Sequence, residues 1–317
     1  MIEVRLFATF REGRGKIVFM EPEKISCPQD VLDELKIPAE EVAICLINGF
    51  HSKLNAPVKD EDVLAIFPPV EVADLPKDSR YERQLIVPQI GGSGQEKLTK
   101  SRVTVVGCGG LGSPVLTYLA MAGVGHLRLI DCDVVSVTNL NRQFFYEESD
   151  VDGVKCEKAA EFLKKRNPQI EVEPINDLLT EENALELLKD SDVVVDCVDR
   201  IAARKIVGWA CTILSIPLVE AGVHGFYGYV LPINPGKSAC LTCMETGPVK
   251  EMIPVPAIGA AVGVIGSLQA VEALKILLGL PVSYGTMLQY DGIYGEFEPI
   301  PVMVREDCVC QMADDQK

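Results

Sequence analysis

A glycine-rich stretch that could bind a nucleotide occupies residues 107–112. Gly107, Gly109 and Gly112 have the spacing GxGxxG. Such glycines allow a tight turn, close approach of the backbone to phosphate, and close packing of a helix on a strand. Asp131 follows Gly112 by roughly the 20 residues that separate this motif from a ribose-binding carboxylate. These residues leave both a nicotinamide-dependent dehydrogenase and an ATP-using enzyme open.

Three further residues favour phosphoryl or nucleotidyl transfer over hydride transfer. Asp133 lies near the end of the expected strand, at the edge where open α/β sheets bind ligands. A second carboxylate at that edge suits Mg²⁺ that bridges phosphate oxygens. Arg142 and Lys155 are cations that could bind a triphosphate and stabilise the charge that develops during transfer.

The elements around these residues predict an α/β fold. Arg102–Val106 is a short β-branched run, which is typical of a buried parallel strand. Ser113–Ala122 predicts a helix whose first N–H groups could bind an anion, and Leu127–Asp131 predicts the next strand. Together they predict a Rossmann-like doubly wound sheet with an ATP site.

The chain resembles the MoeB/ThiF/HesA family, whose members are relatives of the ubiquitin-activating enzymes. The motifs that carry the resemblance are RYERQ (Arg80–Gln84), GCGGLG, Asp131-x-Asp133, NLNRQ, GVK (Gly153–Lys155) and DCVD (Asp196–Asp199). The resemblance implies ATP-dependent adenylation of the C-terminal glycine carboxylate of a ubiquitin-like sulfur-carrier protein, with release of pyrophosphate. It also implies Mg²⁺, a homodimer, and a sulfur donor such as a cysteine desulfurase or a rhodanese-like protein.

The same resemblance assigns nucleotide binding to a set of residues. They are Gly107, Gly109, Gly110, Gly112, Asp131, Asp133, Asn139, Asn141, Arg142, Lys155 and Asp199. Gly110 is expected against the nucleotide and Asp131 at the ribose. Asn139, Arg142 and Lys155 are expected at the phosphates.

The catalytic set that the resemblance implies is Arg83, Arg142, Lys155 and Asp199. Asp199 is expected near the magnesium and phosphates. Arg83 resembles an arginine that family members lend to the ATP site of the partner subunit. Arg200 follows Asp199 at a position where the family usually has asparagine.

Cysteines predict a zinc site. The chain has eleven cysteines and begins with an alternating strand pattern, Met1–Arg5, so we expect reduced thiols and a cytoplasmic location. Cys240 and Cys243 form a CxxC pair, and Cys308 and Cys310 form a CxC pair. Four thiolates suit tetrahedral structural zinc, and the resembling family has a pair at both places, the second normally CxxC.

The segment that follows the first cysteine pair differs from many relatives. Residues 244–258 contain no cysteine, whereas many relatives carry one there that accepts the activated carrier. We therefore expect the reaction to stop at the acyl-adenylate, which a separate sulfur donor attacks. The next segment, 259–280, is long and apolar, but Gln269, Glu272 and Lys275 favour a core or dimer-interface helix over a membrane span.

The first 72 residues predict a separate β-grasp domain, joined by a linker, 73–79, to the adenylation domain, 80–317. Its expected elements are strands at 1–9, 16–20, 41–47 and 63–67 and a helix at 28–35. VRLFATFREGRGK and DEDVLAIFPPV resemble the MoaD/ThiS sulfur carriers, which end in Gly-Gly just after such a segment. Here Val70 is followed by Glu71. The domain is therefore expected to pack, to dock a partner, or to occupy the carrier site, and not to be adenylated itself.

Composition excludes some classes. The formal net charge of −16 argues against a nucleic-acid partner, and the three scattered histidines disfavour a hydrolase triad. Two alternatives to the adenylyltransferase stay open: a non-catalytic carrier-binding scaffold and a dinucleotide-dependent oxidoreductase. The MoaD likeness favours molybdenum or tungsten cofactor synthesis, while thiamine synthesis and tRNA thiolation remain open.

Overall fold

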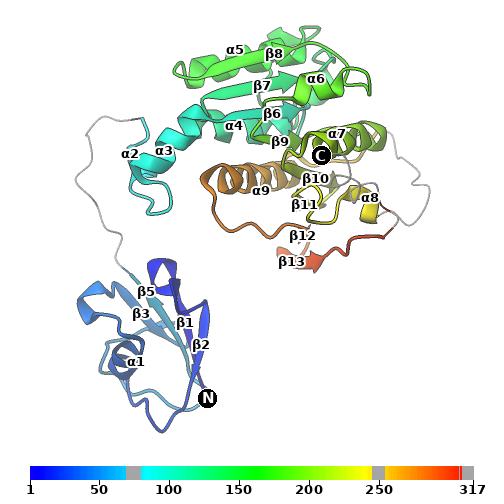
Figure 1. Cartoon of the computed structure of the whole chain (residues 1–317). Coiled ribbons are helices and arrows are strands. Elements are labelled where there is room, and N and C mark those ends of the chain that lie inside the picture. The colour runs from blue at the N-terminus through cyan, green and yellow to red at the C-terminus, as the bar shows by residue number, and fades with distance from the viewer. Residues whose placement is uncertain (69–79, 245–253, 307, 309–317) are drawn as a thin grey trace. The chain divides into compact units, whose positions relative to one another are not determined.

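The computed structural model describes residues 1–68, 80–244, 254–306 and 308. Contacts divide the chain into two compact units, Met1–Leu75 and Pro76–Lys317. Each unit is built around its own β-sheet (Figure 1).

The first unit is a five-stranded sheet with one α-helix. Its elements are β1 (Ile2–Leu6), η1 (Ala8–Arg11), β2 (Ile17–Met20), α1 (Pro28–Leu35), η2 (Ala39–Glu41), β3 (Ile44–Ile47), β4 (Phe50–His51) and β5 (Val63–Phe67). The strand order is β2-β1-β5-β3-β4, in which β1 and β5 are parallel and all other neighbours are antiparallel. This is the predicted β-grasp fold. The two-residue strand β4 was not predicted, because so short a strand shows no periodicity.

Alternation along β1 builds the core of this unit. Ile2, Val4 and Leu6 have no exposed surface and lie on one face of the sheet. Val31 and Leu32 of α1 belong to the same buried cluster. The unit therefore has a hydrophobic core of its own.

The second unit contains the glycine-rich stretch and alternates strands with helices. Its α-helices are α2 (Glu82–Leu85), α3 (Gly91–Lys100), α4 (Gly112–Ala122), α5 (Lys155–Arg166), α6 (Ala184–Leu188), α7 (Ile201–Leu214), α8 (Leu241–Met244) and α9 (Gly259–Leu278). Its strands are β6 (Arg102–Val106), β7 (His126–Ile130), β8 (Glu171–Ile175), β9 (Val193–Asp196), β10 (Leu218–His224), β11 (Tyr227–Ile233), β12 (Thr286–Asp291) and β13 (Glu296–Pro301). The short 3₁₀ helices are η3 (Val137–Asn139) and η4 (Glu148–Asp150).

The large sheet confirms the predicted doubly wound fold. Its order is β13-β12-β11-β10-β9-β6-β7-β8. The five strands from β10 to β8 are parallel, whereas β11, β12 and β13 continue the sheet in antiparallel pairs. The chain runs outward from β6 through β7 to β8 and then returns to β9 on the other side of β6. The boundary between β6 and β9 is therefore the topological switch point, where open α/β sheets bind ligands.

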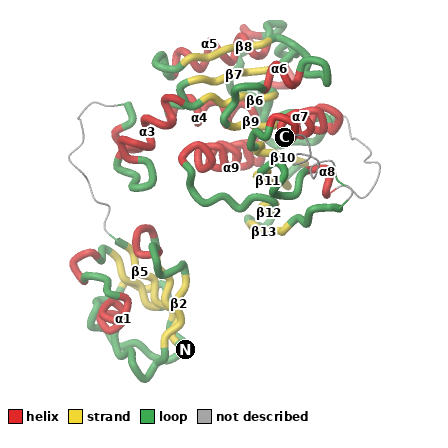
Figure 2. Tube along the Cα trace, viewed as in Figure 1, coloured by secondary structure: helices red, strands yellow, loops and turns green. Residues whose placement is uncertain are grey.

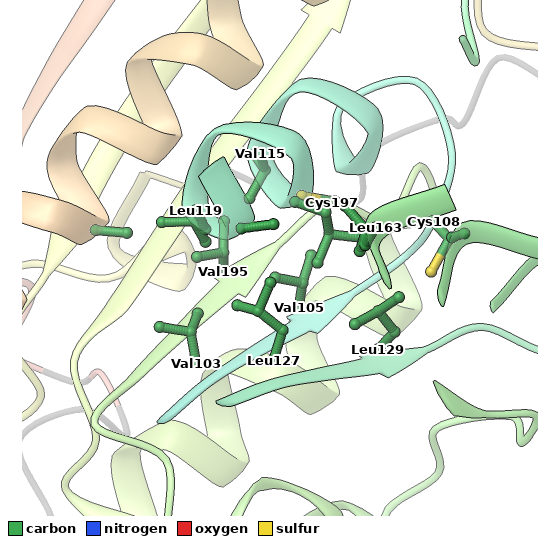
Figure 3. Close-up of a cluster of buried hydrophobic side chains, with 14 of the residues drawn as sticks. Val103, Val105, Cys108, Val115, Leu119, Leu127, Leu129, Leu163, Val195 and Cys197 are labelled. Carbon is green, nitrogen blue, oxygen red and sulfur yellow. The ribbon is translucent and has the colours of Figure 1, made fainter. Parts of the chain in front are cut away.

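Helices cover both faces of this sheet (Figure 2). Val103 and Val105 of β6 pack with Val115 and Leu119 of α4 in one buried cluster (Figure 3). Helices α5 and α9 contribute to the same cluster. Val194 of β9 points to the opposite face and packs with α6 and α7. Both faces of the parallel strands are thus buried, as their continuous apolar sequences predict.

Helix α9 is the one described helix that is long and apolar enough to cross a membrane by length and composition. It contacts α4, β10 and β11 instead. Gln269 in its middle has no exposed surface and donates hydrogen bonds to the carbonyl oxygens of Asp196 and Val219, at 2.7 and 3.2 Å. Gly266 lies against Pro114 of α4, so a Cβ there would come within 2.4 Å of the proline ring. These contacts are those of a core helix, which is one of the two alternatives to a membrane span that its polar residues favoured.

Candidate functional site

A cleft of about 940 Å³ opens at the carboxyl ends of β6, β7 and β9. Val106 and Ile130, the last residues of β6 and β7, form part of its floor. Eight residues of the predicted nucleotide-binding set line it: Gly107, Gly109, Gly110, Asp131, Asp133, Arg142, Lys155 and Asp199. Segments that are distant in the sequence therefore meet at the switch point of the sheet.

Two glycines of the turn after β6 have conformations or contacts that exclude a side chain. Gly107 has a φ of +102°, and a Cβ there would lie 2.7 Å from the carbonyl oxygen of Cys197. Gly112 begins α4, and a Cβ there would lie 2.1 Å from the carbonyl oxygen of Gly107. The first glycine permits the turn and the last permits close packing of helix on strand, as the motif predicts.

Asp131 connects two loops that line the cleft. Its Oδ2 accepts a hydrogen bond from the backbone N–H of Cys108 at 2.7 Å, and its Oδ1 accepts one from Asp133 at 2.8 Å. Burial nevertheless raises the pKa of the Asp131 carboxyl, because the loss of water outweighs these hydrogen bonds and the nearby Lys155. The carboxylate ties the glycine turn to the loop after β7.

The two predicted phosphate-binding cations make different contacts. Lys155 is the first residue of α5, and its side chain is 8% exposed. Its Nζ lies 2.8 Å from Oδ2 of Asp133, so cation and carboxylate form an ion pair in the cleft wall. Arg142 donates from Nη1 to the carbonyl oxygen of Thr138 at 2.9 Å and to Oδ1 of Asn141 at 3.0 Å.

Four predicted residues are not among those that line the cleft: Arg83, Gly112, Asn139 and Asn141. Arg83 is exposed on the short helix α2. Asn139 is buried and accepts the backbone N–H of Ser136, which caps η3. Asn141 is exposed and orients Arg142. In this chain the two asparagines therefore shape the loop that presents Arg142.

The structure adds residues to the cleft beyond the predicted set. Gln143 is buried, lines the cleft, and has an Oε1 without a hydrogen-bond partner among the described residues. Its position as the last residue of the NLNRQ motif was the available signal. Arg204, His224 and Tyr227 form part of the wall on the β10–β11 side. Nothing in the sequence placed Arg204 or Tyr227 there, because their positions depend on strand pairing.

A second cluster consists of Cys240, Cys243 and Cys308, whose sulfur atoms lie within 4.8 Å of one another. The Cys240 sulfur is 3.9 Å from that of Cys243 and 3.5 Å from that of Cys308. A tetrahedral zinc with bonds of about 2.3 Å sets its sulfur ligands roughly 3.8 Å apart. Burial raises the pKa of the Cys240 thiol to about 11. These three residues fit a zinc site, while the predicted fourth ligand, Cys310, lies outside the described residues.

Known proteins match both units. The model of the ThiS family matches residues 4–71, and that of the ThiF family matches residues 81–311. The sulfur carrier protein adenylyltransferase of Thermus thermophilus is 40% identical over 73% of this chain and 90% of its own length. The adenylyltransferase and sulfurtransferase MOCS3 of Sus scrofa is 38% identical over 85% of this chain, which spans 61% of that relative.

Solved structures agree on the fold. The crystal structure of E. coli MccB with ATP superposes with a TM-score of 0.66 at 24% identity, over 74% of this chain and 75% of MccB. At that identity the likeness supports the fold alone. The match of the family model to 81–311 covers most of the chain, and the Thermus thermophilus relative is matched over nearly its whole length. The chain therefore belongs to the ThiF family and carries a ThiS-like domain at its N-terminus.

Proposed function

We propose that this chain is an adenylyltransferase that activates the C-terminal glycine carboxylate of a ubiquitin-like sulfur carrier with ATP. The observation that carries the proposal is the cleft at the β6–β9 switch point, where the glycine turn meets cations and carboxylates of the predicted set; they are Arg142, Lys155, Asp131, Asp133 and Asp199. The likeness to relatives such as the sulfur carrier protein adenylyltransferase of Thermus thermophilus supports the same reaction.

The reaction forms one bond and breaks one bond. An oxygen of the carrier carboxylate attacks the α-phosphorus of ATP, and the bond from that phosphorus to the bridging oxygen of pyrophosphate breaks. Lys155 and Arg142 would bind the phosphates and stabilise the charge on the leaving group. Asp131 would bind the ribose from the turn that it already orders. Asp133 and Asp199 would hold Mg²⁺, which neutralises phosphate oxygens when bound.

Zinc is proposed to have a structural role. Cys240 directly precedes α8 and Cys243 lies within it, whereas Cys308 follows β13. A zinc ion held by these thiolates, with Cys310 as the fourth, would tie the C-terminal segment to the domain. The three cysteines are not among the residues that line the cleft, although Leu241 and Met244 of α8 are. No chemical step is assigned to it.

The reaction of this chain is proposed to stop at the acyl-adenylate, which a separate sulfur donor attacks. The chain has no cysteine between positions 244 and 258, so a thioester on this segment is not available. A cysteine desulfurase or a rhodanese-like protein would supply the sulfur. None of the described cysteines forms a disulfide, which is compatible with a cytoplasmic location.

A homodimer is proposed, in which Arg83 acts at the partner's cleft. Arg83 is exposed, and it is not among the residues that line the cleft of its own chain. Exposed apolar side chains on α4 and α9 support an association surface; they are Tyr118, Met121 and Val271.

The proposal is tested by ATP–pyrophosphate exchange with and without carriers that end in free Gly-Gly. We expect exchange that depends on the carrier, and a panel of MoaD-like and ThiS-like carriers would identify the pathway. Exchange without any carrier would point to another carboxylate substrate. Absence of exchange in a folded protein that still binds ATP would favour the scaffold alternative.

Asp199→Ala provides the first prediction. Because Asp199 is exposed into the cleft next to the expected triphosphate, its loss should lower the exchange rate by about 10²–10³-fold while the melting temperature stays unchanged. Glu181→Ala, which removes an exposed carboxylate elsewhere, is the control. Full activity in Asp199→Ala would refute the assignment of this residue.

A further inference from the structure

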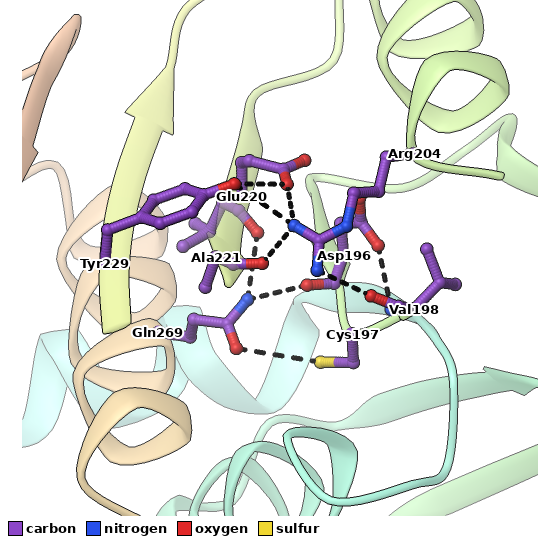
Figure 4. A network of polar contacts seen from close by, with 9 residues as sticks. Asp196, Cys197, Val198, Arg204, Glu220, Ala221, Tyr229 and Gln269 are labelled. Atoms are coloured by element: carbon purple, nitrogen blue, oxygen red, sulfur yellow. Dashed lines mark hydrogen bonds and ion pairs between the residues drawn. The ribbon is translucent and has the colours of Figure 1, made fainter. Parts of the chain in front are cut away.

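The turn between β9 and α7 carries Asp199, and ionisable side chains form hydrogen bonds to its backbone. The backbone N–H of Val198 donates to Oδ1 of Asp196 at 3.0 Å. The carbonyl oxygen of Val198 accepts a hydrogen bond from Nη2 of Arg204 at 2.8 Å. Both polar groups of the residue before Asp199 are thus fixed by ionisable side chains (Figure 4).

Arg204 is itself fixed on several sides. Its side chain is 11% exposed, and its Nη1 lies 2.5 Å from Oε1 of Glu220. The same nitrogen donates to the carbonyl oxygen of Ala221 and lies 3.2 Å from the Tyr229 hydroxyl. One guanidinium therefore connects the β9–α7 turn to β10 and β11. Lysine cannot reproduce this, since it lacks the planar fork of donors.

The carboxyl groups around Arg204 are buried without full hydrogen bonding. Asp196 and Glu220 have no exposed surface, and Oδ2 of Asp196 and Oε2 of Glu220 have no partner among the described residues. Burial and the neighbouring Asp196 raise the pKa of Glu220 well above its ordinary value. Glu220 therefore favours its neutral form more strongly than an exposed glutamate does, and its Oε1 accepts a hydrogen bond from the Arg204 guanidinium.

Such a cluster is expensive to bury compared with apolar side chains of the same volume. For the fold, the cluster only joins β9, β10 and α7, and β9 and β10 are already joined by strand pairing. What the cluster adds is a defined position for the peptide that precedes Asp199.

We infer that Arg204 is a positioning residue, which holds the Val198 peptide and thereby sets the place of the Asp199 carboxylate in the cleft. The inference deepens the proposed function and rests on it for the role of Asp199. Arg204 also borders the cleft, so the test must separate positioning from direct contact with substrate.

Arg204→Lys is compared with a matched control, Arg128→Lys. Arg128 is also 11% exposed, pairs with Glu173 at 2.8 Å and donates to the carbonyl oxygen of Leu187 at 2.9 Å, but it does not line the cleft. Carrier-dependent exchange should fall about 10- to 100-fold in Arg204→Lys, the range seen when a residue that orients a ligand-binding group is lost. The Mg²⁺ concentration that gives half-maximal pyrophosphate exchange should rise. Arg128→Lys should leave both quantities unchanged at a similar melting temperature.

The Asp199→Ala background separates positioning from contact. If Arg204 acts through Asp199, adding Arg204→Lys to Asp199→Ala lowers exchange no further. A multiplicative loss in the double variant would mean that Arg204 acts on the substrate directly, and would overturn the inference.

Amide hydrogen exchange of residues 197–201 in the full chain gives a readout that does not need activity. These amides should exchange hydrogen faster in Arg204→Lys than in wild type. Their exchange rates should be unchanged in Arg128→Lys. If wild type shows no pyrophosphate exchange, the proposed function fails, while this comparison still decides whether Arg204 holds the turn. Equal amide exchange in all three proteins would overturn the inference.

Glu220 supplies a second pair of variants should Arg204→Lys not fold. Glu220→Ala removes the acceptor that orients Nη1 of Arg204 and should lower pyrophosphate exchange and loosen residues 197–201. Glu220→Gln keeps an acceptor for Arg204 and an amide that can donate to Asp196, so it should restore both. Equal behaviour of the two variants would contradict a positioning role.

Discussion

Glu220 shows how one buried side chain makes the stability of the whole chain depend on pH. It lies on β10 with its carboxyl group fully buried, next to Asp196 and Arg204. Its pKa is raised in the folded state, mainly by burial. The folded chain therefore keeps a proton that the unfolded chain releases as pH rises above about 4.3, the ordinary pKa of glutamate.

We predict that Glu220→Gln increases the free energy of unfolding at neutral and alkaline pH relative to wild type. Because the folded state binds more protons than the unfolded state, wild-type stability due to this group falls with rising pH, by up to about 1.4 kcal/mol per unit. That loss continues until pH reaches the folded-state pKa. Glutamine has no such dependence, so the gap between the two proteins should widen upward from pH 5. Urea unfolding between pH 5 and 9 measures it, with exposed Glu181→Gln as control. A constant gap would contradict a protonated Glu220.

Residue types predicted the cleft better than they predicted its support. Gly107, Asp131 and Lys155 were identifiable because the motifs bring glycine, carboxylate and cation together in one segment. The contact between Arg204 and Glu220 was not, because it depends on the register of β10 against β9. Asn139 has a capping contact that the motif did not indicate. Motifs identify the chemical groups of the cleft, whereas the contacts that position these groups are known only from the packing of the folded chain.

Among the elements, α8 lies close to Cys308, whose sulfur is 3.5 Å from that of Cys240 just before the helix. We predict that Cys308→Ser lowers both the zinc content and the melting temperature, since structural zinc stabilises the fold of the segment that it joins. Zinc content is measured by elemental analysis and melting by calorimetry, with buried Cys211→Ser as a control that should keep the metal. Full zinc content in Cys308→Ser would remove this residue from the site.

Element prediction succeeded where a pattern was long. Strand β6 and helix α1 coincide with the predicted residues, because a β-branched run and a proline-initiated helix are strong local signals. Strand β4 and the 3₁₀ helices were missed, since two to four residues carry no period. The length of α9 was overestimated only by the two residues after Leu278, where Gly279 ends the helix with a φ of +73°.

At the scale of the whole molecule, the proposed exchange of Arg83 between subunits predicts complementation. Arg83→Ala and Asp199→Ala should each retain only a small residual exchange rate alone. Mixed after dissociation, they form heterodimers in which one cleft has both wild-type residues, so about one quarter of wild-type exchange should return. Pyrophosphate exchange on the mixture measures this, with each variant remixed with itself as control. No recovery from a verified heterodimer would place Arg83 in its own cleft or outside catalysis.

Removal of the ThiS-like domain tests whether this domain competes with a free carrier. A tethered domain competes at an effective concentration near the millimolar range, so deleting residues 1–72 should lower the KM for a free carrier while kcat is retained. Steady-state exchange against carrier concentration measures both. An unchanged KM would leave the domain a packing role, and a raised KM would indicate that it recruits the carrier.

The mixed sheet of the second unit has a consequence for the order of folding. Strands β10 and β11 form a hairpin, as do β12 and β13, so each of these two pairs joins residues that are close in the sequence. The parallel strands pair over longer separations, as Val103 of β6 does with Val193 of β9. Loop closure over such separations slows pairing. When the full-length chain refolds, the β6–β9 boundary and the cleft that opens there are therefore expected to form after the two hairpins.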